Sequence, residues 1–158
     1  MVSTRTAARF SGLVLTALST GVFFGTRVSL GPSTRQFPPR TYVEVQQATV
    51  RNLRPVMGPL LPAAVAANAV VLALSGRERR SAAFALTLAG LCLQLASLGL
   101  TAAVELPINA RVLTWSPDDP PAGWEAVRDR WATVHTARTA SAVAGLGCLA
   151  AAALAPAG

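Results

Sequence analysis

Four long stretches of this chain carry no Asp, Glu, Lys or Arg, and they limit the possible folds more than any other feature. They cover residues 10–26, 55–76, 81–104 and 139–158 of the 158-residue chain. A helix of roughly 17–25 apolar residues crosses the hydrocarbon core of a bilayer, and each stretch has a length of that order. The chain is 52% hydrophobic and only 13% charged, so a small soluble core cannot hold all four stretches. The sequence therefore predicts an all-α integral membrane bundle of four transmembrane helices.

The chain has the length of one domain, which we expect to cover residues 1–158. Residues 29–54 are predicted as a loop, in which residues 41–54 lack helix breakers and can form a short amphipathic helix at the membrane interface. Pro59 and Pro62 predict a kink near the start of the second helix. The transmembrane helices are expected at about residues 8–28, 55–76, 81–111 and 124–155.

The expected location is the cell membrane, with the chain as a multi-pass protein. Arg5 and Arg9 precede the first apolar stretch, as in a signal peptide. Arg27 stands where cleavage would need small residues, which favours a retained helix. The orientation stays open, because the basic cluster at residues 77–80 and the larger number of arginines on the other side indicate opposite orientations.

The formal net charge of +7 does not indicate a nucleic-acid partner. All 14 basic residues are arginines, and they are scattered between the apolar stretches, where charges that flank membrane helices belong. The expected partner is the lipid bilayer, and an oligomer remains possible. Cys92 and Cys148 lie in apolar stretches as small hydrophobic residues. With a single His and no Cys pair at ligand spacing, the sequence predicts no zinc or other metal site.

Two polar stripes are predicted to meet at one end of the bundle. Glu105 and Asn109 are four residues apart near the end of the third helix. Trp131, His135 and Arg138 are separated by four and three residues at the start of the fourth helix. Such spacings place side chains on one helix face. Ionisable residues in a membrane are costly and indicate a functional site.

Each of these residues also has a purely structural interpretation, which the sequence leaves open. Arg138 and Glu105 can form an ion pair that only closes the bundle. His135 can be a buried histidine that is hydrogen-bonded to Asn109. Trp131 can be an aromatic anchor at the membrane interface.

Four further polar residues and a glycine pair are assigned mainly structural roles. Asn68 and Gln94 are predicted to hydrogen-bond between helices rather than to bind a substrate. Gln46 and Gln47 form a wet loop face, unless residues 41–54 fold over the polar stripes as a lid. The segment GVFFG at residues 21–25 has the small-xxx-small spacing that permits close helix contact.

Two short motifs carry a resemblance to a known family. They are Pro107-x-Asn109 in the third helix and Trp131-x-x-x-His135-x-x-Arg138 in the fourth. With the length and helix layout of the chain, they resemble the anthrone-oxygenase-like family of small four-helix membrane proteins. The resemblance implies an oxygenase for some members, which convert an anthrone methylene to a quinone carbonyl with dioxygen and no identified cofactor. Most bacterial members have no demonstrated activity.

The resemblance and the residues together suggest a mechanism as a hypothesis. His135, Asn109 and Arg138 are the expected catalytic residues, and Trp131 and Glu105 the expected substrate-binding residues. A neutral His135 would take the proton of the carbon acid, and Asn109 and Arg138 would stabilise the resulting oxyanion. Trp131 would stack on a flat polycyclic aromatic substrate, and Glu105 would orient its basic neighbours.

A second class of function remains open. The chain can be a non-enzymatic membrane protein that binds a lipophilic ligand or serves as an accessory subunit of a membrane complex. That interpretation needs only the ion pair, the small-residue helix faces and the aromatic anchors. A proton-coupled transporter is disfavoured, because the sequence shows no internal repeat.

Overall fold

The computed structural model describes residues 4–76 and 79–155 of the chain. Within these residues, four helices are long and apolar enough to cross a membrane, and the fold is all-α as predicted. The third of these is continuous over Ala82–Val112 but contains a π-helical turn. In chain order the elements are α1 (Thr4–Ser29), the short 3₁₀ turn η1 (Ser33–Arg35), α2 (Pro39–Leu74), α3 (Ala82–Leu100), the π-helical turn η3 (Thr101–Glu105), α4 (Leu106–Val112) and α5 (Trp124–Leu154).

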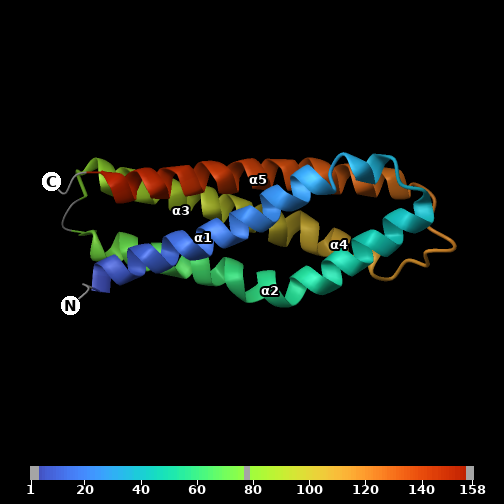
Figure 1. Cartoon of the computed structure of the whole chain (residues 1–158), viewed down its shortest axis with the longest axis horizontal. Coiled ribbons are helices and arrows are strands. Elements are labelled where there is room, and N and C mark those ends of the chain that lie inside the picture. Colours follow the sequence, from blue (N-terminus) through green and yellow to red (C-terminus); the bar gives the residue numbers. More distant parts are fainter. Residues whose placement is uncertain (1–3, 77–78, 156–158) are drawn as a thin grey trace.

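The helices run alternately up and down along one long bundle (Figure 1). The start of α1, the end of α2, the start of α3 and the end of α5 lie at one end of the bundle, and the α1–α2 and α4–α5 connections lie at the other. α3 packs closely along α5, and α1 packs along α2 and α5. This topology brings the end of the third span and the start of α5 to the same end, as the sequence predicted.

The predicted boundary between a loop and a helix at residue 55 is wrong. α2 begins at Pro39 and runs through residues 41–54 into the apolar span without a break. Pro39 suits the first turn of a helix, where its missing N–H would have no partner. Pro55, Pro59 and Pro62 lie inside α2, and each removes one helical hydrogen bond and bends the helix. The helix therefore bows away from α4 instead of ending (Figure 1).

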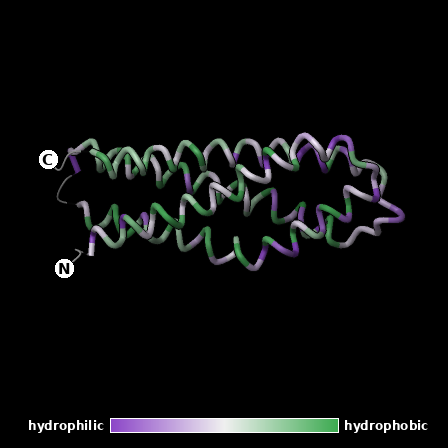
Figure 2. Tube along the Cα trace, viewed as in Figure 1, coloured by the Kyte–Doolittle hydropathy of each residue, from purple (hydrophilic) through white to green (hydrophobic). Residues whose placement is uncertain are grey.

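The surface of the bundle is apolar and its interior contains many polar residues. Large hydrophobic side chains are exposed on all four long helices, including Phe10, Phe24, Val56, Leu95 and Val143. Figure 2 shows hydrophobic colour along much of the outer length of the helices near the chain ends. Because lipid tails are as apolar as leucine, this arrangement is stable in a bilayer and unfavourable in water.

α3 and α5 approach each other closely at two glycines, whereas the predicted glycine pair of α1 makes no such contact. A Cβ atom on Gly90 would lie 2.7 Å from the Cγ atom of Leu149. A Cβ atom on Gly145 would lie 3.2 Å from the carbonyl oxygen of Gly90. By contrast, Cβ atoms on Gly21 and Gly25 would meet nothing within 4 Å. The spacing at residues 21–25 therefore does not mediate a contact between the described helices.

Thr16, Asn68 and Gln94 form a hydrogen-bonded group in the interior, which we call the central amide cluster. The Asn68 side-chain amide donates to Thr16 Oγ1 at 3.0 Å and to Gln94 Oε1 at 3.2 Å. The Gln94 amide donates to Thr16 Oγ1 at 2.6 Å. The cluster joins α1, α2 and α3, which confirms that Asn68 and Gln94 bond helix to helix.

An aromatic cluster closes the end of the bundle that carries the long connections. The Gln47 amide donates to the carbonyl oxygens of Val112 and Trp115 at 3.0 and 2.9 Å, and so caps the end of α4. Gln46 and Gln47 are buried, so the first part of α2 covers the interior as a lid and is not a wet loop face. The buried members of the cluster are Tyr42, Val43, Val112, Trp115 and Trp124.

Candidate functional site

The π-helical turn η3 positions the acidic residue of the site. Pro107 has no N–H and cannot bond the carbonyl group four residues before it. The chain adapts just upstream, where the N–H of Leu106 bonds the carbonyl oxygen of Thr101, five residues back. Such π-turns occur often at functional sites. As a result, Thr101 and Glu105 both lie against α5 and are buried.

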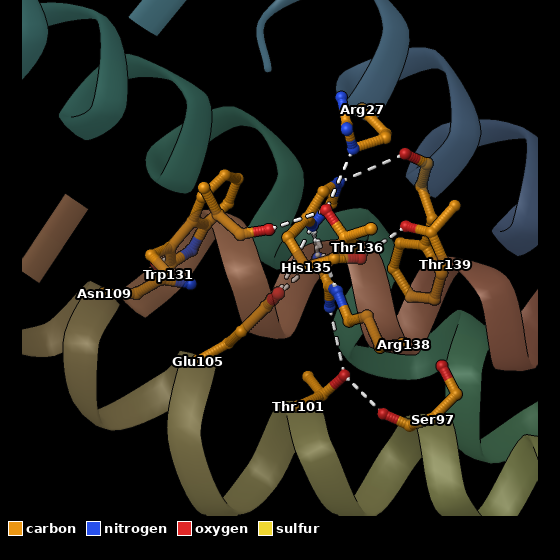
Figure 3. A network of polar contacts seen from close by, with 12 residues as sticks. Arg27, Ser97, Thr101, Glu105, Asn109, Trp131, His135, Thr136, Arg138 and Thr139 are labelled. Atoms are coloured by element: carbon orange, nitrogen blue, oxygen red, sulfur yellow. Dashed lines mark hydrogen bonds and ion pairs between the residues drawn. The ribbon is translucent and has the colours of Figure 1, made fainter. Parts of the chain in front are cut away.

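Glu105, His135 and Arg138 form a buried group that we call the charged cluster (Figure 3). Arg138 Nη2 lies 2.7 Å from Glu105 Oε2, and His135 Nδ1 lies 3.3 Å from Glu105 Oε1. Arg138 Nη1 also donates to Thr101 Oγ1 at 3.0 Å. Only 1% of Glu105, 2% of His135 and 8% of Arg138 is exposed. The ion pair between Arg138 and Glu105 that the sequence suggested is therefore present, and His135 lies in contact with the same carboxylate.

The hydrogen bonds of His135 indicate its tautomer. His135 Nε2 lies 3.2 Å from the carbonyl oxygen of Phe23. A carbonyl oxygen only accepts, so Nε2 carries the proton in this arrangement. Arg138 directs Nε and Nη2 toward His135 Nδ1 at 3.2 and 2.9 Å. In this tautomer the lone pair of Nδ1 accepts from Arg138.

Two aromatic side chains fix the ring of His135 and the guanidinium group of Arg138. The rings of Trp131 and His135 are stacked with centroids 4.6 Å apart and an interplanar angle of 7°. Phe23 meets His135 edge-on, and the Arg138 guanidinium carbon lies 4.0 Å from the centroid of the Phe23 ring. These contacts restrict both groups to one orientation.

Asn109 does not contact His135, contrary to one interpretation of the sequence. Its Oδ1 atom accepts from Trp131 Nε1 at 3.1 Å and from Gln46 Nε2 at 3.5 Å. Its Nδ2 atom has no hydrogen-bond partner within residues 4–76 and 79–155. The amide hydrogens on Asn109 Nδ2 are therefore free to donate to a ligand, whereas Oδ1 already accepts two hydrogen bonds.

A cavity of about 520 Å³ borders the charged cluster. Its size falls in the range of small-molecule sites. Carbon-rich side chains from α1, α2, α3 and α4 form most of its wall, among them Val22, Phe23, Val50, Leu53, Met57, Leu61, Leu98, Leu106 and Leu113. The polar residues in the lining are Thr26, Gln46, Thr49, Arg54, Thr101, Glu105, Asn109, Trp131 and Arg138.

The structure brings all five predicted site residues together but gives them unequal access to this cavity. Glu105, Asn109, Trp131 and Arg138 line it. His135 is not part of the lining and lies behind Glu105 and Arg138. A ligand in the cavity therefore lies next to Glu105, whereas it can reach His135 only through a neighbour.

The chemistry of the site is that of acid–base transfer and anion binding. The described part of the chain contains no group of three or more His, Cys, Asp or Glu side chains placed to hold a metal ion. The cluster instead offers a carboxylate next to an imidazole, with a guanidinium group against both. Such a set can take a proton from a ligand and stabilise the negative charge that remains.

The sequence interpretation missed three groups that belong to the site or line its cavity. Thr101 holds Arg138, the carbonyl group of Phe23 holds His135, and Arg54 lines the cavity from α2. Pro107 was a usable signal for Thr101, because a proline within a helix disturbs the turn before it. No local signal identifies a backbone carbonyl of α1 as the partner of a residue 112 positions later.

Fold and site together define a helical bundle of membrane-spanning dimensions, with a buried ionisable cluster beside an apolar cavity. A family model described as anthrone oxygenase matches residues 48–148, and the chain belongs to this family. The matched segment contains the whole charged cluster, Asn109 and Trp131, and it excludes α1. Neither the curated proteins nor the solved structures contain a match to this chain.

Proposed function

We propose that the protein is a multi-pass protein of the cell membrane and an oxygenase for a polycyclic phenolic substrate. The reaction converts the methylene carbon of an anthrone-type ring to a quinone carbonyl, with consumption of dioxygen and release of water. The observation that carries this proposal is the position of Glu105 and Arg138 in the lining of an apolar cavity of about 520 Å³, with His135 in contact with both.

The cavity suits a flat and largely apolar ligand. Five of its polar residues lie where η3, α4 and α5 meet, and the other polar ones are Thr26, Gln46, Thr49 and Arg54 on α1 and α2. Aliphatic side chains and Phe23 form most of the remaining wall. A polycyclic ring gains free energy from leaving water or the membrane interface for such a site. The ring oxygen can then accept from the free amide hydrogens of Asn109.

Deprotonation of the methylene carbon is the first step. Glu105 takes the proton because its carboxylate borders the cavity, and it passes the proton to His135 Nδ1, which lies 3.3 Å away. The carbonyl oxygen of Phe23 and the carboxylate of Glu105 then stabilise the imidazolium ion. Arg138, which also lines the cavity, stabilises the new oxyanion of the substrate together with Asn109.

Oxidation follows on the substrate itself. The anion gives one electron to dioxygen, and the two radicals combine to form the carbon–oxygen bond of a hydroperoxide. Loss of the second methylene proton breaks the oxygen–oxygen bond and forms the carbonyl group. One oxygen atom enters the quinone and the other leaves as water, so the four electrons lost by the carbon reduce one molecule of dioxygen. Closure by the lid segment of α2 keeps bulk water from the anion.

The test measures dioxygen uptake and the visible spectrum of purified, detergent-solubilised protein with an anthrone. We compare the wild type with Glu105→Gln and His135→Ala, and use Asn68→Leu as a control that changes a buried polar residue away from the cavity. We expect quinone formation that is lost in both cluster variants and retained in the control.

Two results would contradict the proposal. Uptake no faster than spontaneous oxidation, with folded wild-type protein that still binds the anthrone, would favour the non-enzymatic ligand-binding alternative. Quinone formation that is equal in all variants would remove the charged cluster from the reaction. Folding of each variant is checked by circular dichroism and by elution as a single species.

A further inference from the structure

Arg54 stands apart from the other charged residues of the cavity. It lies on α2, in the same helix face as Val50, Met57 and Leu61, and it is exposed. Within the described part of the chain, its guanidinium group makes no ion pair and no hydrogen bond. Its guanidinium group is therefore available to bind an anionic ligand at the edge of the cavity.

The charges in the cavity lining do not balance. The ionisable residues that line it are Glu105, Arg138 and Arg54. Glu105 and Arg138 neutralise each other at 2.7 Å. The charge of Arg54 has no counter-charge in the lining, and it lies on a different helix from the charged cluster. The cavity therefore attracts a ligand that carries a negative charge away from its reacting carbon.

We propose that Arg54 binds an acidic substituent, a carboxylate or an ionised phenol, on the aromatic ligand of this cavity. The inference rests on the proposed function and narrows its substrate class to anionic polycyclic compounds. The planar guanidinium group binds a carboxylate through two parallel hydrogen bonds. One end of the ligand is held at Arg54 on α2, and the carbon that reacts is placed at Glu105 on the wall formed by η3.

The test is a binding measurement that does not depend on turnover. Anthracene-2-carboxylate and its uncharged methyl ester have no methylene carbon to oxidise in the ring, and their fluorescence reports binding to the protein in a nonionic detergent. We expect the wild type to bind the carboxylate about tenfold more tightly than the ester. Arg54→Gln should lose this preference and keep the affinity for the ester, and Arg54→Lys should restore part of the preference.

Arg51→Gln is the matched control. Arg51 lies one helix turn before Arg54, is also exposed, does not line the cavity and donates to Gln47 Oε1 at 3.1 Å. The Arg51→Gln substitution removes the same charge from the same helix as Arg54→Gln. A general effect of net charge on the partition of the probe into micelles would therefore lower the preference for the carboxylate equally in both variants. We expect the preference to be unchanged in Arg51→Gln.

Four results would overturn the inference or its basis, and they are distinguishable. Retention of the preference in Arg54→Gln would remove Arg54 from ligand binding. Loss of the wild-type preference on addition of phosphatidylglycerol but not phosphatidylcholine would identify a lipid phosphate as the anion that Arg54 binds. Failure of the wild type to bind either probe would count against the aromatic ligand of the proposed function, whereas equal affinity for both probes would count against Arg54 alone.

Discussion

The central amide cluster and the charged cluster are both buried polar groups at helix junctions, but they differ in what their polar atoms face. In the central amide cluster, Asn68, Gln94 and Thr16 bond one another, and the adjoining void is only about 20 Å³. The charged cluster borders a cavity of about 520 Å³. Buried polar residues therefore join helices in one place and border a cavity in the other.

The two clusters also differ in how much their contacts contribute to the free energy of unfolding. A hydrogen bond between membrane helices contributes on average about 0.6 kcal/mol. Removal of one partner from a buried ion pair costs about 3–5 kcal/mol, because the other charge is left without compensation.

The largest expected effect is on the stability of the charged cluster. Glu105→Gln leaves the charge of Arg138 unpaired, and we expect the free energy of unfolding in detergent to fall by about 3 kcal/mol. The double variant Glu105→Gln/Arg138→Met should recover most of this loss while it remains inactive. Chemical unfolding followed by tryptophan fluorescence measures both. A double variant that is less stable than the single one would show that the pair is not the source of the loss.

The next largest effect separates the two functions of Asn109. Asn109→Asp keeps an acceptor oxygen for Trp131 Nε1 but removes the amide donors that face the cavity. Removal of one donor to an oxyanion lowers turnover by about a hundredfold, and we expect that loss in dioxygen uptake with an anthrone. The emission spectrum of Trp131, recorded in a variant without Trp115 and Trp124, should stay unchanged. Full activity in Asn109→Asp would exclude the amide as an oxyanion donor.

A smaller effect is expected from filling the cavity without a change in charge. Gly58 lines the cavity, and a Cβ atom there would meet nothing within 4 Å. Gly58→Leu should raise KM for an anthrone about tenfold, since the new side chain takes space from the ligand, while stability rises slightly because glycine is a poor helix former. Gly21→Leu is the control, because Gly21 is also open but lies outside the cavity lining. Equal effects of both variants would argue against ligand binding in this cavity.

The smallest effect is expected in the central amide cluster. Asn68→Leu removes the donor that joins α2 to Thr16 and Gln94, and we expect a loss of about 1 kcal/mol in the free energy of unfolding. Turnover and the affinity for aromatic probes should stay within twofold of the wild type. A turnover loss as large as that of Glu105→Gln would remove the distinction between the two clusters.

Much of the bundle was predictable from local features of the sequence. Charge-free stretches of the length of a membrane span identified the four helices, and helical spacing identified the stripes of Glu105 with Asn109 and of Trp131 with His135 and Arg138. The start of α2 was predicted wrongly. Proline was taken as a helix boundary at residue 55, whereas three prolines are accommodated inside a helix that other helices and lipid support on its sides.

The sequence by itself determined the all-helical membrane fold and the set of polar residues that meet at one end of it, because hydrophobic length and helical period are local properties of the chain. Only the tertiary structure decided which residues face the cavity. It placed His135 behind Glu105 and bound Asn109 to Trp131, and it left Arg54 at the cavity without a partner among the described residues. These positions depend on the π-helical turn η3, which rotates the residues after it about the helix axis, and on the bend of α2. Neither feature can be predicted by adding up the helix preferences of single residues.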